Sequence, residues 1–141
     1  MSDAIKVLMD DHKKVDRLFK QAGDGGKYEY MIQICQELTI HATLEEEFIY
    51  PILEDIDPDS ASEAQDEHDQ LKGIIEEIEN MDPGDPEIRQ AARMLRNVLA
   101  HHVEEEESQV FPKLEAELGV ERLKEIARDM YARRQELLAE L

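Results

Sequence analysis

The stretch HATLEEEFIYP, residues 41–51, returns later in the chain as HVEEEESQVFP, residues 102–112. The two copies are 61 residues apart and share the histidine, two adjacent glutamates, the aromatic residue and the final proline. A shorter pair accompanies them, because DDH ends at His12 and DEH ends at His68, an offset of 56 residues. This repetition predicts two helical hairpins that are related by a pseudo-twofold axis.

Apolar residues recur at intervals of three and four along most of the chain, which is the spacing of amphipathic helices, and strand-like alternation is missing. Glycine and proline gather at a few points, which we interpret as breaks between helices. We therefore predict an all-α protein. The short links between long helices predict an antiparallel, up-down four-helix bundle with an additional C-terminal helix. The helices are expected at about residues 3–22, 27–54, 60–80, 86–118 and 121–140.

The chain has the size of one domain. Its 141 residues, 41% of them hydrophobic, suffice for one compact core and are too few for two. We expect a single domain over residues 1–141, in which the four-helix bundle takes up about residues 3–118 and the C-terminal helix about residues 121–140. That last helix either caps the bundle or supports dimerisation, so the expected state is a monomer or a weak homodimer.

The charge balance excludes two classes of partner. Sixteen basic residues stand against 35 acidic ones, a formal net charge of −19, which disfavours binding to nucleic acid and to membranes. The N-terminal residues contain no apolar segment of the kind found in signal peptides, so we expect a cytoplasmic protein. The single cysteine, Cys35, forms neither an internal disulfide nor a thiolate metal cage. Any bound metal would therefore use nitrogen and oxygen ligands.

Each of the first four predicted helices carries a histidine in its apolar seam, where a bundle expects leucine. In the second helix Glu45 follows His41 by four residues, and in the fourth helix Glu106 follows His102 by the same interval. Residues four apart lie on one face of a helix, so both members of each pair face the core. Burying a carboxylate is costly unless a cation accompanies it, and no lysine or arginine lies near either glutamate in the same seam. We infer a metal site.

Six side chains are predicted to converge as metal ligands. Four nitrogen and two oxygen donors exceed what one tetrahedral zinc ion takes, but they suit two octahedral iron or manganese ions that share bridging carboxylates and keep open positions. A single-metal or zinc site, and a metal-free bundle with buried polar networks, are the alternatives. The predicted ligands are His12, His41, Glu45, His68, His102 and Glu106.

At these residues the chain resembles the hemerythrin-like, HHE-type cation-binding family, whose pattern is a lone histidine, HxxxE, a second lone histidine and a second HxxxE. The resemblance covers about residues 3–118. It implies a bundle around two non-haem iron ions, oxo- or hydroxo-bridged when oxidised, with manganese as the other candidate metal. Members of this family variously bind dioxygen, sense oxygen or redox state, handle peroxide or nitric oxide, or act on iron itself. The implied partner is a small diatomic or peroxide ligand.

One departure from the family bears on function. Oxygen-carrying hemerythrins are similar but place another histidine one turn after the third-helix ligand, where this chain has Lys72. The fifth histidine, His101, points roughly 100° away from His102 on the helix and does not replace it. We therefore expect a redox-active site rather than an oxygen carrier. If the protein is an enzyme, we expect a di-iron oxidoreductase that consumes peroxide or oxidises ferrous iron. A sensing module without turnover, and iron storage or donation of the iron–sulfur repair type, are the alternatives.

Several polar and aromatic residues near the predicted ligands are assigned no part in the chemistry. We expect Tyr50 and Phe111 to fill the end of the bundle, and the proline that follows each ring should kink or end its helix. We expect Cys35 to be a small buried residue. The polar positions expected to face solvent are Asp16, Glu46, His101, Glu104, Glu105 and Glu107.

Overall fold

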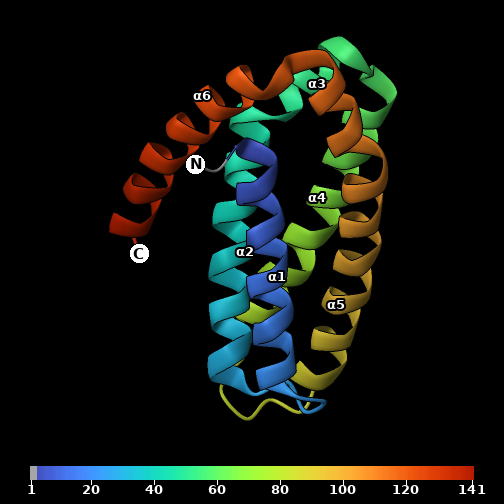
Figure 1. Cartoon of the computed structure of the whole chain (residues 1–141). Coiled ribbons are helices and arrows are strands. Elements are labelled where there is room, and N and C mark those ends of the chain that lie inside the picture. The colour runs from blue at the N-terminus through green and yellow to red at the C-terminus, as the bar shows by residue number, and fades with distance from the viewer. Residues whose placement is uncertain (1–2) are drawn as a thin grey trace.

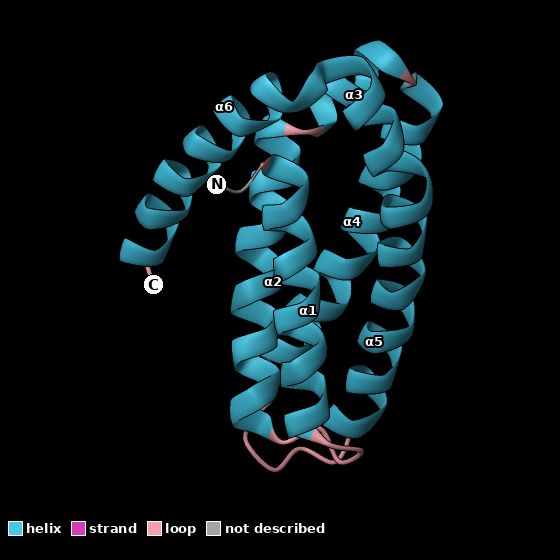
Figure 2. Cartoon of the chain, viewed as in Figure 1, coloured by secondary structure: helices cyan, strands magenta, loops and turns pink. Residues whose placement is uncertain are grey.

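The protein is described by a computed structural model that covers residues 3–141. Figure 2 shows helices joined by short loops, and no strand occurs within these residues, so the predicted all-α class is confirmed. The helices are α1 (Ala4–Ala22), α2 (Tyr28–Phe48), α3 (Tyr50–Ile56), α4 (Pro58–Glu79), α5 (Ile88–Glu105), the π-helical segment η1 (Glu106–Val110) and α6 (Phe111–Ala139).

The four long helices α1, α2, α4 and α5 lie side by side with alternating direction and form the predicted up-down bundle (Figure 1). The short helix α3 lies at the end of the bundle opposite the two glycine-containing loops and links α2 to α4. The segment η1 and the start of α6 continue α5. Helix α6 then crosses this end of the bundle, and its later part packs against α1 and α2. No helix within residues 3–141 is both long enough and apolar enough to cross a membrane.

The predicted second helix, residues 27–54, is two helices in the structure. Helix α2 ends at Phe48, and α3 begins at Tyr50 with Pro51 in its first turn. Proline has no backbone N–H to donate, and its ring collides with the carbonyl group four residues earlier, so the helix breaks just before it. The proline was predicted to kink or end its helix, and this is confirmed.

The corresponding proline of the other half, Pro112, is accommodated differently. Here the helix widens into η1, in which the Phe111 backbone N–H donates to the Glu106 carbonyl oxygen five residues earlier. A π-helical turn of this kind absorbs one extra residue and is common at functional sites. The predicted start of the fourth helix at residue 86 is corrected to Ile88, because the Asp85 side chain accepts a hydrogen bond from the Glu87 backbone N–H and holds a turn there.

The predicted break between the fourth and fifth helices is confirmed at Gly119. Its φ of 78° lies in the left-handed region, and the helix axis bends there although α6 is otherwise continuous. Glycine adopts this backbone conformation without the steric penalty of a Cβ atom. The bend directs the C-terminal part of α6 back along the bundle.

Two apolar clusters fill the interior and lie on either side of a polar layer. One cluster involves α1, α2, α4 and α5 towards the loops, and the other joins the opposite ends of α1, α2 and α4 to α3, η1 and α6. Cys35 is fully buried in the first cluster, as predicted. The buried polar residues that separate the clusters are His41, Glu45, His68, His102 and Glu106.

Candidate metal centre

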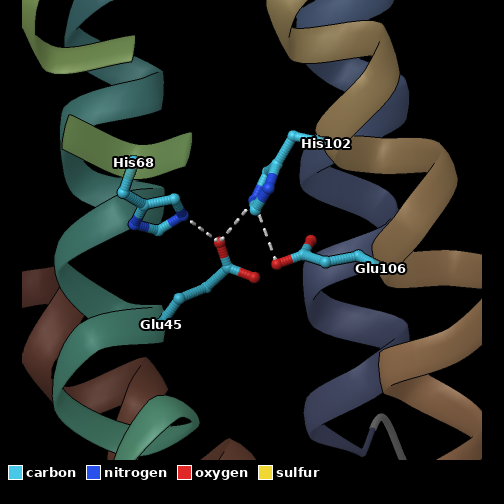
Figure 3. A group of neighbouring side chains, drawn as sticks. All are labelled: Glu45, His68, His102 and Glu106. Carbon is cyan, nitrogen blue, oxygen red and sulfur yellow. Dashed lines mark hydrogen bonds and ion pairs between the residues drawn. The ribbon is translucent and has the colours of Figure 1, made fainter. Parts of the chain in front are cut away.

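The structure brings all six predicted ligands together in the middle of the bundle. Helix α1 contributes His12, α2 contributes His41 and Glu45, and α4 contributes His68. Helix α5 contributes His102, and η1 contributes Glu106. They form two groups that share Glu106, and the potential ligand atoms within each group lie within 4.8 Å of one another. Figure 3 shows the group of four, in which Glu45 and Glu106 point towards each other between His68 and His102.

Each carboxylate lies closest to two histidines, one from its own half of the sequence and one from the other half. Glu45 Oε1 lies 3.1 Å from His41 Nε2 and 3.0 Å from His68 Nε2. Glu106 lies 3.1 Å from His12 Nε2 through Oε1 and 3.2 Å from His102 Nε2 through Oε2. This is the arrangement that the sequence repeat predicts, because a pseudo-twofold rotation exchanges Glu45 with Glu106.

The residues present fit a group of positive charge. Among the described residues, neither Glu45 nor Glu106 is paired with lysine or arginine, although both side chains are fully buried. Buried polar atoms ordinarily have a hydrogen-bond partner. Several buried atoms of the predicted ligands make no hydrogen bond here, although they lie close to other members of the cluster. Among them are His12 Nε2, His41 Nε2, Glu45 Oε2 and Glu106 Oε1. Donor atoms that converge without satisfying one another are expected where cations bind.

A ring of outer carboxylates contacts the histidines from behind, and two of its members, Asp11 and Glu67, were not predicted from the sequence. Asp11 Oδ2 lies 2.9 Å from His41 Nδ1, and Glu67 Oε1 lies 2.7 Å from His102 Nδ1. These two acids are the middle residues of the repeated DDH and DEH motifs. A carboxylate on Nδ1 fixes the orientation of the ring, so that Nε2 faces the centre.

Glu46 and Glu107, which follow Glu45 and Glu106, also belong to this outer ring, but they lie at different distances from the histidines that they face. Glu107 Oε2 lies 2.9 Å from His12 Nδ1, so this residue is exposed as predicted but also supports a ligand. Glu46, its equivalent, lies 3.8 Å from His68 Nδ1, which has no hydrogen-bond partner. Glu46 is instead hydrogen-bonded to Lys72, whose Nζ donates to Glu46 Oε1 at 2.6 Å.

Tyr50 is a further member of the site, and its assignment as an end-filling ring without chemistry is wrong. Its hydroxyl oxygen lies 2.7 Å from His68 Nε2 and donates to Glu106 Oε2 at 3.3 Å. The equivalent ring, Phe111, packs parallel to His12 at 6.0 Å between ring centroids and carries no hydroxyl. The hydroxyl of Tyr50 therefore has no counterpart in the other half of the site.

The remaining polar residues near the site lie outside the buried cluster. His101 is 68% exposed and lies 3.1 Å from Glu105, so its predicted surface position is confirmed. Lys72 and Asp16 are also about half exposed. Four of the five histidines thus form the cluster, and His101 does not.

Mutual attraction in the cluster stabilises charged side chains. Burial lowers the pKa of His41, but the charges of Glu45 and Asp11 outweigh it and raise this pKa to about 10. Burial likewise lowers the pKa of His102, and Glu106 and Glu45 raise it to about 12. Burial raises the pKa of Glu45, whereas the charge of His41 brings it well below its ordinary value. Without a metal, the cluster therefore holds protons on histidines at neutral pH.

Comparison with known proteins agrees with this geometry. The family described as the hemerythrin HHE cation binding domain matches residues 3–114. The chain belongs to this family. A crystal structure of a hemerythrin HHE cation binding domain-containing protein from Mycobacterium kansasii superposes with a TM-score of 0.82 over 99% of this chain and 90% of that one. At 23% sequence identity, that likeness shows the shared fold.

A curated relative of this HHE domain is a protein named DNA nickase from Nostoc sp.. The two are 34% identical over an alignment of 131 residues that covers 89% of this chain. The aligned region spans only 37% of the length of the Nostoc protein.

Metal binding to this HHE domain should release protons. The raised pKa values of His41 and His102 mean that the metal-free site keeps protons on nitrogen that a metal must displace. Affinity for Mn²⁺ or Fe²⁺ should therefore fall as the pH is lowered from about 8 to about 6. Titration of the metal-free protein in weak buffer with a pH indicator measures the release. Binding of metal with no release, and with an affinity independent of pH, would contradict the protonation described here.

Proposed function

We propose that this HHE domain holds two non-haem iron ions and uses them to react with a small ligand such as peroxide, nitric oxide or dioxygen. The observation that carries the proposal is the convergence of four imidazoles and two carboxylates in one buried layer without lysine or arginine. Four nitrogen donors and two anionic oxygen donors suit octahedral iron, and manganese is the alternative metal.

The division of the ligands supports two ions rather than one. Glu45 and Glu106 each lie between two histidines, and the four histidines come from four different helices. Both carboxylates would therefore be available to more than one ion. Two histidines for each ion, with shared carboxylates, leave coordination positions for water or a ligand. When bound, iron would supply one-electron redox chemistry and a Lewis acid for an incoming ligand.

The protein's own residues would orient the site, shield it and hold a proton near it. The outer carboxylates orient the imidazoles, and the two apolar clusters limit access of water from both ends of the bundle. Burial raises the pKa of Tyr50, and the charges of Glu45 and Glu106 raise it further. The Tyr50 hydroxyl therefore keeps its proton at a hydrogen-bonding distance from the ligand side chains.

The set of histidines favours redox reaction over oxygen carriage. Lys72 takes the place of the additional histidine of oxygen carriers, and its Nζ pairs with Glu46 at the surface. His101 is exposed and supplies no replacement. Fewer protein ligands leave more of each iron open to exogenous molecules, which promotes reaction with peroxide or oxygen.

We do not propose that this chain nicks DNA, although the Nostoc relative is named a DNA nickase. This chain spans only 37% of the length of that protein, and its net charge of −19 disfavours binding to DNA.

The first test is metal content. Protein reconstituted anaerobically with ferrous iron should retain about two iron ions per chain after desalting, as six N/O ligands in a helical bundle support. His41→Ala removes an imidazole that contacts Glu45 and should lose at least half of the iron. His101→Ala is the matched control, because its exposed ring lies outside the cluster and iron content should stay unchanged. Full iron retention in His41→Ala would contradict the assignment.

The second test distinguishes reaction from carriage. The iron-loaded protein should consume many equivalents of hydrogen peroxide when a chemical reductant is present, and His41→Ala should lose most of this activity. Oxygen electrode and peroxide assays measure turnover. Reversible binding of oxygen over many cycles, without autoxidation or peroxide consumption, would make the protein a carrier instead.

The third test concerns Tyr50. Replacement Tyr50→Phe removes the hydroxyl that lies among the ligands and places there the same residue type as Phe111 in the other half. The visible spectrum of the ferric protein should change, because a hydrogen bond or bond from this oxygen alters the electronic surroundings of the iron. Tyr131→Phe is the control, since Tyr131 is 67% exposed. Identical spectra for Tyr50→Phe and the unsubstituted protein would remove Tyr50 from the site.

A further inference from the structure

Two spaces flank the centre at positions that the pseudo-twofold axis relates. One is a wide groove of about 580 Å³ between α1 and α5. The other is a narrow pocket of about 130 Å³ between α2 and α4. The sequence repeat pairs α1 with α4 and α2 with α5, so the two spaces are equivalent in the fold but differ in size.

Only the narrow pocket reaches several ligands. His41, His68 and His102 line it together with mainly apolar side chains, among them Ala42 and Leu71. The wide groove is lined by one predicted ligand, His12. Glu107 also lines that groove and lies 2.9 Å from His12 Nδ1, so the groove meets the outer edge of this ring rather than the Nε2 edge that faces the centre.

Side-chain size at equivalent positions explains why one space reaches further inwards. Ala42 lines the narrow pocket, and its equivalent, 61 residues later in the repeat, is Val103, which lines the wide groove. Val103 carries two more methyl groups than Ala42. Ile75 and its equivalent Phe19 also differ so that the larger side chain lines the wide groove, whereas Leu71 and Val15 differ in the opposite sense. Ala42 is the smallest residue that lines the narrow pocket.

The mouth of the narrow pocket carries the residue that distinguishes this chain from oxygen carriers. Lys72 lines it and pairs with Glu46, and Thr39 lies exposed on the facing helix. At the equivalent place in the wide groove stands Asp16, which cannot form this pair with Glu107 because both are acidic. The lysine that replaces a histidine ligand thus forms part of the rim of the pocket.

We propose that the pocket between α2 and α4 is the binding pocket and access route for the small ligand, with Ala42 as the residue that keeps it open. This inference rests on the proposed function. A volume of 130 Å³ exceeds the roughly 10–15 Å³ that one water molecule requires but falls below the roughly 300–1,000 Å³ of pockets for organic ligands. The apolar lining suits uncharged molecules of two to four atoms.

The test compares nitric oxide binding to the diferrous protein in two reciprocal variants by stopped-flow absorption. Ala42→Val should slow binding by about tenfold, as expected when two methyl groups enter a closely packed passage. Val103→Ala makes the complementary change in the wide groove and should leave the rate unchanged. Slower binding in Ala42→Val alone supports the route. An unchanged rate in this variant, or a faster rate in Val103→Ala, would overturn it.

A second pair at the surface guards against a folding defect in Ala42→Val. Thr39→Trp and its repeat equivalent Ala100→Trp both alter exposed positions, at the mouth of the narrow pocket and of the wide groove respectively. Thr39→Trp should slow binding of nitric oxide, and Ala100→Trp should not. Equal effects, or slowing by Ala100→Trp alone, would contradict the inference. If the unsubstituted protein holds iron and binds nitric oxide, failure of these contrasts refutes the route alone, whereas absence of iron or of binding refutes the proposed function.

Discussion

The rest of the site depends on two carboxylates, Glu45 and Glu106, that are buried together in the centre of the bundle. Isolated charges in such a place are strongly unfavourable, and in this chain histidines from four helices surround them. Mutual attraction keeps the metal-free layer charged, with protons on the imidazoles. A bound cation would replace these protons and satisfy the donor atoms that now lack a partner. The helical ends on both sides of the layer pack as ordinary apolar core, so the polar layer is confined to the site.

The repeat gives this layer a second row of residues that the bundle places behind the first. Asp11 and Glu67 each hold the imidazole of a neighbouring helix, and the C-terminal helix takes part through Arg134, whose Nη2 donates to Asp11 Oδ2 at 2.7 Å. The C-terminal part of α6 is thereby linked to His41 through two polar contacts. The symmetry is broken at several positions; for example, Phe111 stands where the first half has Tyr50, and Val103 stands where it has Ala42.

The spacing of residues in the sequence was sufficient to predict the bundle and the six side chains at its centre, because positions on one face of a helix repeat at three and four residues. Asp11 and Glu67 were missed because each precedes a histidine by one position, about 100° from the seam, and its role depends on the adjacent helix. Tyr50 was missed for a related reason. In an unbroken helix it would lie about 140° from Glu45, and only the break before Pro51 turns its hydroxyl towards the centre. The Tyr-to-Phe difference between the two copies was the available signal.

Anomalous diffraction from crystals of the iron-loaded protein, with data collected on both sides of the iron absorption edge, would locate the metal ions directly. We expect two anomalous peaks in the polar layer, one near His41 and one near His102, with Glu45 and Glu106 close to both. Absence of peaks there, or a single peak at the exposed group formed by Glu67, His101 and Glu105, would contradict this expectation.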